Sequence, residues 1–185
     1  GVTSLLPTIQ VVVFSVAAVP LAAGARHVCW IPEFGLTLCW GANASGQLGD
    51  GSTTGSANPV PVATQQIFVA VTAGGDHTCA LTGDGTAYCW GANTFGQLGT
   101  GTTPPSLTPA AVTGGLKFSQ ILAGNNFTCG IDMTGVAYCW GNNGGKLGDG
   151  NPTSNASAPR AVFGTLTFTR LGLWGDNHAC GIAVG

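Results

Sequence analysis

Charged residues are scarce in this chain of 185 residues. It contains five Lys or Arg and seven Asp or Glu, which gives a formal net charge of −2. A surface with so few cations cannot neutralise many phosphates, which argues against nucleic-acid binding driven by counterion release. The sequence also lacks a polybasic segment that would attract an anionic membrane. We therefore expect neither a nucleic acid nor a charged lipid surface as a partner.

Good helix formers are also few, whereas 31 glycines and 10 prolines are spread along the chain. This composition indicates a β-rich fold with many turns. The hydrophobic residues are dispersed, so a core can form without a membrane span. Residues 9–23 resemble the apolar core of a signal peptide, but Pro20 interrupts them and no basic residue precedes them. Their end aligns with residues 68–74 of a later repeat, which favours a strand over a targeting segment.

Cysteines mark an internal repeat. The first cysteine of each copy is Cys29, Cys79, Cys129 or Cys180, so successive copies are spaced by 50, 50 and 51 residues. A period near fifty is typical of solenoids and propellers, in which each unit is one supersecondary element. Within a unit the apolar residues alternate with period two, and an Asp-Gly turn at residues 83–85 predicts a tight hairpin. The repeat therefore predicts stacked β-sheets.

The repeated pattern Ala-Gly-x-x-His-x-Cys-x-Leu, followed by Cys-Trp-Gly-x-Asn-x-x-Gly-Gln-Leu-Gly, resembles the repeat of the regulator-of-chromosome-condensation family. The resemblance implies an all-β fold, a seven-bladed β-propeller with four strands in each blade. We expect residues 1–185 to form a single partial propeller of about 3.7 blades. The expected repeat units are residues 9–58, 59–108, 109–158 and an incomplete unit at 159–185.

A ring of seven such units needs roughly 350 residues, so this chain is expected to leave an open edge. The chain also begins and ends inside a repeat unit, which suggests a fragment of a longer protein. We expect the remaining blades to come from the same longer chain or, as the second alternative, from an adjacent subunit. An uncovered blade would expose apolar strand faces, such as residues 11–14, and favour self-association.

Three matched pairs of cysteines predict three disulfides. Ten positions separate the two thiols of each pair across its turn, where opposed Cβ atoms lie about 4.5–5.5 Å apart and local twist can bring them closer. Zinc ligation is one alternative, but no CxxC motif is present. Buried reduced thiols are another, but they do not explain identical spacing in three copies. The predicted pairs are Cys29–Cys39, Cys79–Cys89 and Cys129–Cys139, which place the chain in an oxidising compartment.

Cys180 has no partner in this sequence, because its equivalent would lie near position 190. Three acceptor triplets for N-glycosylation fit an oxidising compartment, at Asn43, Asn126 and Asn155. Asn155 is ranked first because it lies in a Pro- and Ser-containing loop. Asn43 is ranked last because its side chain is expected to serve its own turn.

The sequence does not contain a recognisable catalytic constellation, and we expect no enzyme and no cofactor. His27, His77 and His178 occupy the same place in their repeats, where the third copy has Phe127. A ring of histidines could bind a metal at a propeller centre. The Phe and the lack of an accompanying carboxylate favour hydrogen-bonding inner residues instead, so we expect no metal site.

The leading functional hypothesis is an extracellular structural or recognition module, such as part of a receptor ectodomain or a component of a wall or surface fibre. The paired cysteines make the chain similar to the secreted branch of the family, represented by crinkly-type receptor ectodomains. Expected partners are a protein or glycan at the cell surface, other copies of the chain, or further blades. Two alternatives stay open: a secreted protein inhibitor and a guanine-nucleotide exchange scaffold. An exposed aromatic cluster would favour the inhibitor, and Trp30, Phe95 and Trp174 are its candidates.

Overall fold

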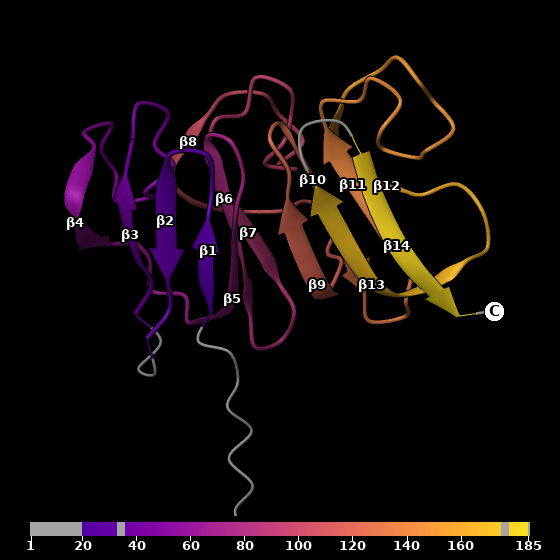
Figure 1. Ribbon diagram of the computed structural model, residues 1–185, viewed down its shortest axis with the longest axis horizontal. Helices are drawn as coiled ribbons and strands as arrows, with labels where there is room; N and C mark the ends of the chain where they lie inside the picture. The colour runs from indigo at the N-terminus through magenta and orange to yellow at the C-terminus, as the bar shows by residue number, and fades with distance from the viewer. Residues whose placement is uncertain (1–19, 33–35, 175–177, 185) are drawn as a thin grey trace, which may run out of the picture.

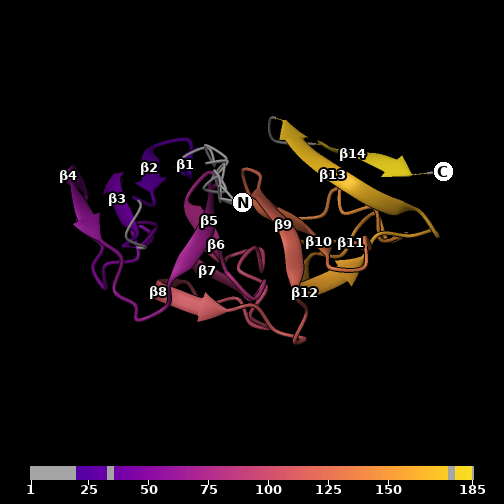
Figure 2. The same ribbon diagram turned by 90° about the horizontal axis from the view of Figure 1, so that it is seen from below.

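The computed structural model describes residues 20–32, 36–174 and 178–184. In this part the chain folds into four antiparallel sheets that follow one another along an arc (Figure 1, Figure 2). Three sheets have four strands each and the last has two. The strands are β1 (Leu21–Ala23), β2 (His27–Trp30), β3 (Leu38–Gly41), β4 (Ser56–Pro61), β5 (Phe68–Ala73), β6 (His77–Thr82), β7 (Ala87–Gly91), β8 (Ser106–Ala111), β9 (Phe118–Ala123), β10 (Phe127–Asp132), β11 (Ala137–Gly141), β12 (Ala156–Ala161), β13 (Thr167–Trp174) and β14 (His178–Val184).

Each sheet is a propeller blade in which consecutive strands are neighbours. The first, second and third blades are complete, and β13 with β14 forms a half-blade, so the predicted all-β propeller is confirmed with about three and a half blades. The expected repeat boundaries at 58/59, 108/109 and 158/159 lie within β4, β8 and β12. This difference arises because a sequence period does not say where one sheet ends. The apolar residues 11–14 lie outside the described residues.

Local chemistry explains the hairpin between the second and third strands. In the second blade, the Asp84 carboxylate accepts hydrogen bonds from the backbone N–H of Thr86 and from the Thr82 hydroxyl. Gly85 then takes a φ of +82°, a conformation that favours glycine. In the third blade Asp132, which occupies the place of Thr82, accepts hydrogen bonds from the backbone N–H groups of Thr134 and Val136, and Gly135 takes a φ of +90°. The Asp-Gly signal therefore sets the turn of the second blade, and both turns share a glycine with positive φ.

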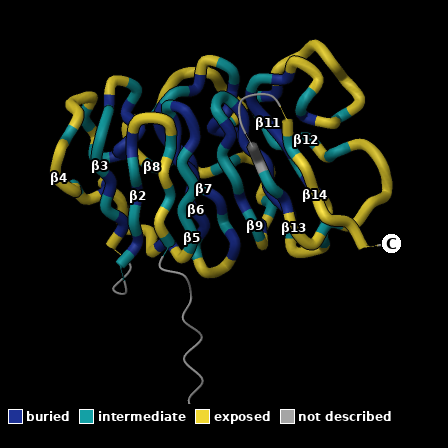
Figure 3. The backbone as a smooth tube through the Cα atoms, in the orientation of Figure 1, coloured by how far each residue is buried: buried dark blue, intermediate teal, exposed yellow. Residues whose placement is uncertain are grey.

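The first strands of the blades line the inner side of the arc. β5 contacts both β1 and β9, and β9 contacts β13, whereas β4, β8 and β12 lie on the outside (Figure 2). The two middle strands of each complete blade contain most of the buried core residues, and the outer strands are more exposed (Figure 3). Within the second blade Phe68 stacks on Trp90 with ring centroids 5.8 Å apart. Phe118 and Trp140 make the corresponding contact in the third blade at 5.7 Å.

The antiparallel topology gives the propeller two different faces. One, which we call the turn face, contains the turns between second and third strands and the connections between blades. The other, the loop face, contains the short first turns and the long loops 42–55, 92–105 and 142–155. In Figure 1 the long loops of the second and third blades project upward. Within the described residues no helix has the length and apolar character needed to cross a bilayer.

Candidate functional site: the stapled blades and their seams

A disulfide closes the central hairpin of each complete blade. The pairs are Cys29–Cys39, Cys79–Cys89 and Cys129–Cys139, with Cα atoms 4.1 Å apart in each. In every pair the two cysteines stand directly opposite each other in the register of the second and third strands. All six are at most 3% exposed, so reductants in solvent have little access to them. These bonds are structural staples.

A polar relay joins the first blade to the second at the boundary that we call the first seam. Thr78 donates its hydroxyl hydrogen to the backbone oxygen of Gln47 at 2.8 Å. The same hydroxyl oxygen lies 2.8 Å from Nε2 of His27. Because a hydroxyl has one hydrogen, His27 must be the donor in this second bond. The relay therefore fixes His27 as the neutral tautomer that carries its proton on Nε2.

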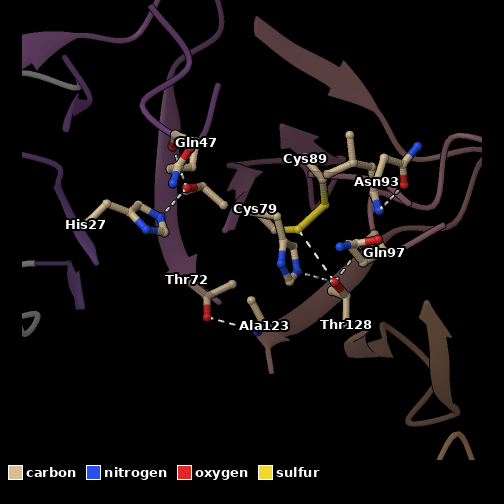
Figure 4. The surroundings of a disulfide bond; sticks show 12 residues. His27, Gln47, Thr72, Cys79, Cys89, Asn93, Gln97, Ala123 and Thr128 are labelled. Carbon is tan, nitrogen blue, oxygen red and sulfur yellow. Dashed lines mark hydrogen bonds between the residues drawn. A yellow bond between two sulfur atoms is a disulfide. The ribbon is translucent and has the colours of Figure 1, made fainter. Parts of the chain in front are cut away.

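The second seam repeats the relay with the residues one unit later. Thr128 donates to the backbone oxygen of Gln97 at 2.8 Å, and Nε2 of His77 donates to Thr128 Oγ1 at 2.9 Å (Figure 4). All three side chains are at most 1% exposed. The repeat thus supplies each relay from two blades, which ties neighbouring sheets together.

Burial keeps both relay histidines neutral. It lowers the pKa of His27 to about 4, opposed by the nearby negative charge of Asp76. It lowers the pKa of His77 to about 3, assisted by repulsion from His27 and opposed by Asp76. The Nδ1 atoms of both rings are buried without a hydrogen-bond partner, so a second proton would have no acceptor there. The expected hydrogen-bonding role of these histidines is observed, with partners in the next blade.

The third seam, between the third blade and the half-blade, has lost the relay. Phe127 replaces the histidine, Lys146 replaces the glutamine, and Ala179 replaces the threonine. The Lys146 ammonium instead lies 5.3 Å from the centroid of the Phe127 ring, a cation–π contact. Gln120 strengthens this seam by accepting a hydrogen bond from the backbone N–H of Leu171 at 2.7 Å. Both relay side chains, the histidine and the threonine, are therefore replaced at this seam, whereas the glutamine took part in the relay only through its backbone oxygen.

The three glycosylation candidates have different surroundings on the loop face. Asn43 is 1% exposed, and its Nδ2 donates to Asp50, Ser52 and Thr54 while its Oδ1 accepts from the N–H of Leu48. Asn126 is half-buried in a short turn. Asn155 is exposed, and its Oδ1 accepts from the N–H of Asn143 at 3.0 Å. Occupancy of the three sites stays a prediction.

Three ion pairs join basic to acidic side chains within the residues that the structure describes. Lys117 Nζ lies 2.6 Å from Asp84, whose carboxyl pKa it holds far below the usual range together with hydrogen bonds from threonines. Arg26 pairs with Asp76 across the first seam at 2.9 Å, and Arg160 pairs with Asp149 at 2.9 Å. No group of three or more His, Cys, Asp or Glu in the described ranges is placed to hold a metal ion.

The sequence reasoning missed several features that the fold creates. Thr78 and Thr128 stand one position before a cysteine in two copies, and this repetition was the available signal. Phe163 is 84% exposed and follows β12, although nothing in its sequence context distinguishes it. Of the proposed aromatic candidates, Trp30 and Phe95 are half-buried, and the side chain of Trp174 lies outside the described part.

Comparisons with known proteins agree with this architecture. The family model described as "Regulator of chromosome condensation (RCC1) repeat" matches residues 35–81 and 84–131, just over half of the chain, and a second model of the same description matches residues 68–97. Among curated proteins, none matches the sequence.

Solved structures show the same fold. Prp20p from Saccharomyces cerevisiae matches with a TM-score of 0.80 and 20% identity, over 89% of this chain and 44% of that one. Human WBSCR16 matches with a TM-score of 0.76 and 20% identity, over 88% and 44%. The chain therefore spans less than half the length of these two proteins. The ectodomain of the receptor kinase CR4 from Physcomitrella patens is 25% identical over 89% of this chain and 46% of that one, with a lower TM-score of 0.48. The repeat match and the shared propeller architecture together show that this chain belongs to the RCC1 repeat family.

Proposed function

We propose that this chain is part of a non-catalytic recognition module that works outside the cell or on its surface. The observation that carries the proposal is the set of three buried disulfides, placed in the same register in all three complete blades. Cytosolic and nuclear proteins are kept reduced, so structural disulfides are typical of secreted proteins. The exposed sequon at Asn155 fits the same compartment.

We assign the recognition of a protein partner to the turn face. Four large apolar side chains are exposed there, with exposed fractions of 52% for Leu36, 68% for Ile67, 59% for Met133 and 58% for Leu166. Exposed apolar side chains that gather on one face are typical of protein-binding surfaces. The three sequons lie on the opposite loop face, where attached glycans would leave the turn face free.

A guanine-nucleotide exchange scaffold is the alternative that the family leaves open. The solved structure of Prp20p is described together with its binding to Gsp1p and histones, and its propeller has the same fold. The disulfides count against this alternative, because such partners belong to a reducing compartment. A secreted inhibitor is less well supported, because Phe163 is the one highly exposed aromatic side chain in the described ranges.

Mapping the thiols in native material tests the compartment. Protein is isolated from its source in the presence of an alkylating reagent and digested without reduction. We expect three peptide pairs linked through Cys29–Cys39, Cys79–Cys89 and Cys129–Cys139, and no alkylation of these six residues. Alkylated thiols at these positions would overturn the extracellular proposal and favour the exchange scaffold.

Site-specific crosslinking tests the assignment of the turn face. A photo-crosslinking residue is placed at Met133 or, as the control, at Thr103, which is exposed on the loop face. We expect the Met133 probe to trap a protein partner at the cell surface and the Thr103 probe to trap none. The opposite pattern would move the binding surface to the loop face.

A further inference from the structure

The long loop of the second blade ends in an exposed Thr-Thr-Pro-Pro segment, residues 102–105. A second Thr-Pro pair, Thr108 with Pro109, follows in β8. Segments that combine threonine with proline are typical acceptors of O-linked sugars. By sequence both Thr103 and Thr108 qualify as acceptors, because each directly precedes a proline. The structure separates the two.

The Thr103 hydroxyl is free to react. Asn93, which is 0% exposed, holds the loop from its inner side by donating through Nδ2 to the carbonyl oxygens of Thr102 and Pro104 at 2.9 Å each. Thr103 lies between these two anchors and is exposed. Within the part of the chain that the structure describes, its hydroxyl makes no hydrogen bond. A group attached to this oxygen would therefore break no contact of the fold.

The two prolines fix the conformation in which Thr103 is presented. A residue before a proline is sterically driven into an extended conformation. Consecutive prolines favour a polyproline II segment, whose backbone is solvated and makes no internal hydrogen bonds. Such a segment is already in the shape that a peptide-binding groove accepts, so little conformational entropy is lost when an enzyme binds it. Residues 103–105 therefore form a preorganised acceptor segment.

Thr108 is also exposed, but it belongs to a paired strand. β8 pairs with β7, and the carbonyl of Leu107 accepts a hydrogen bond from the N–H of Gly51 in the first blade. A Cβ added to Gly51 would lie 3.9 Å from Cγ2 of Thr108. An enzyme that bound this segment in a groove would have to lift the strand from these neighbours.

The other two complete blades have a threonine at the same place in their long loops. Thr53 and Thr153 are exposed, but Thr54 and Ser154 follow them instead of a proline. The Thr153 hydroxyl is also engaged, because it donates to the Asn151 side chain at 3.3 Å. The second blade thus combines the exposed loop position, the free hydroxyl and the two prolines.

We propose that Thr103 is an acceptor for O-linked glycosylation and takes a hexose or N-acetylhexosamine from a nucleotide-activated sugar. The threonine oxygen forms a bond to the anomeric carbon as the bond from this carbon to the diphosphate oxygen breaks. The nucleoside diphosphate leaves with that electron pair, and the hydroxyl proton is released with it. The inference rests on the proposed extracellular function. The sugar would lie on the loop face with the three sequons and leave the turn face free.

Glycopeptide mapping of native protein tests the site. The protein is alkylated during isolation and digested, and its peptides are fragmented by electron transfer, which leaves sugars attached to their side chains. We expect a sugar on Thr103 and none on Thr108. An unmodified Thr103, or a sugar on hydroxylated Pro104 or Pro105 in its place, would overturn the inference. When the six blade cysteines are paired in the same sample, such a result leaves the proposed function intact, whereas alkylated cysteines would overturn that function.

Transfer to the isolated chain tests the structural selection without regard to the compartment. Unglycosylated chain 1–185 is incubated with UDP-N-acetylgalactosamine and a transferase that adds this sugar to threonine. We expect Thr103 to be modified about tenfold faster than Thr108, and a Thr103→Val chain to take up no sugar in this loop. In a peptide of residues 100–112 we expect both threonines to be modified, because neither is held in a strand. Equal rates at the two threonines of the folded chain would overturn the proposal.

Discussion

His27 and Thr78 belong to different blades, and their side chains meet in a hydrogen bond of 2.8 Å across the first seam. The Thr78 hydroxyl donates a hydrogen bond to the backbone oxygen of Gln47. This oxygen also accepts a hydrogen bond from the indole N–H of Trp90 at 3.0 Å. One threonine thus connects the inner strands of a blade to the loop of the preceding blade. Each propeller blade buries its faces against its neighbours, so we expect these contacts between blades to contribute to the free energy of unfolding.

Thr78→Val tests the relay. The substitution keeps the shape of the side chain but leaves the His27 N–H without its acceptor and the Gln47 oxygen without one donor. We expect a loss of about 1–3 kcal/mol in the free energy of unfolding, measured by urea denaturation. Thr103→Val is the control because Thr103 is exposed, and we expect its stability to stay within about 0.5 kcal/mol of the original. Equal stability of the two variants would show that the relay contributes nothing.

The buried histidines make stability depend on pH. In the unfolded chain both take up a proton near pH 6.5, but in the folded chain the pKa of His27 is about 4 and that of His77 about 3. Protons therefore bind the unfolded state preferentially, and stability falls as the pH drops from about 6.5 towards 4. The loss is at most about 3 kcal/mol for each histidine. Urea denaturation at a series of pH values measures it.

Two checks separate the histidines from other titrating groups. The variant His27→Gln/His77→Gln should lose most of the pH dependence above pH 4.5. In the original protein, NMR of the imidazole protons should show both rings neutral at pH 5. Titration of either ring near pH 6.5 in the folded protein would contradict the structural assignment.

Gly99→Ala tests the contact between a loop glycine and the tryptophan of the next blade. Gly99 has a φ of +70°, and an added Cβ would lie 2.6 Å from Nε1 of Trp140. Gly114 also has a positive φ but open space around it, so Gly114→Ala reports the backbone strain alone. We expect Gly99→Ala to be less stable than Gly114→Ala by about 1–3 kcal/mol. Thermal unfolding of the two variants measures this difference. Equal stabilities would mean that the Trp140 side chain can move away from the added Cβ without cost.

The sequons should be occupied in the order Asn155, Asn126, Asn43. Asn155 is exposed, whereas the Asn43 side chain amide donates inside its own loop. A glycan on Asn43 would displace those hydrogen bonds and open the loop around Leu48. Intact-glycopeptide mass spectrometry on native protein gives the occupancies. Full occupancy of Asn43 beside an empty Asn155 would reverse the ranking.

Several features of this protein were determined by its sequence alone. The fifty-residue period and the period-two alternation predicted stacked β-sheets, because each copy carries the same local signals for strands and turns, and the resemblance to the repeat family implied four strands in each blade. The ten-residue spacing about each turn placed cysteines such as Cys79 and Cys89 opposite each other, since an antiparallel hairpin is a local structure whose register its turn fixes. The expectation that the Asn43 side chain serves its own turn was also local, and its amide donates to backbone oxygens of that loop.

Other features were decided only by the tertiary structure. The relay from His27 to Thr78 joins residues about one repeat apart, and its Gln47 oxygen is a backbone atom that no sequence motif reveals. Only the contact between the third blade and the half-blade shows that Phe127 and Ala179 replace the two relay side chains at one seam, where Lys146 lies over the Phe127 ring instead. Sequence periodicity fixes what each blade is, whereas contacts between side chains far apart in the chain decide how blades recognise one another.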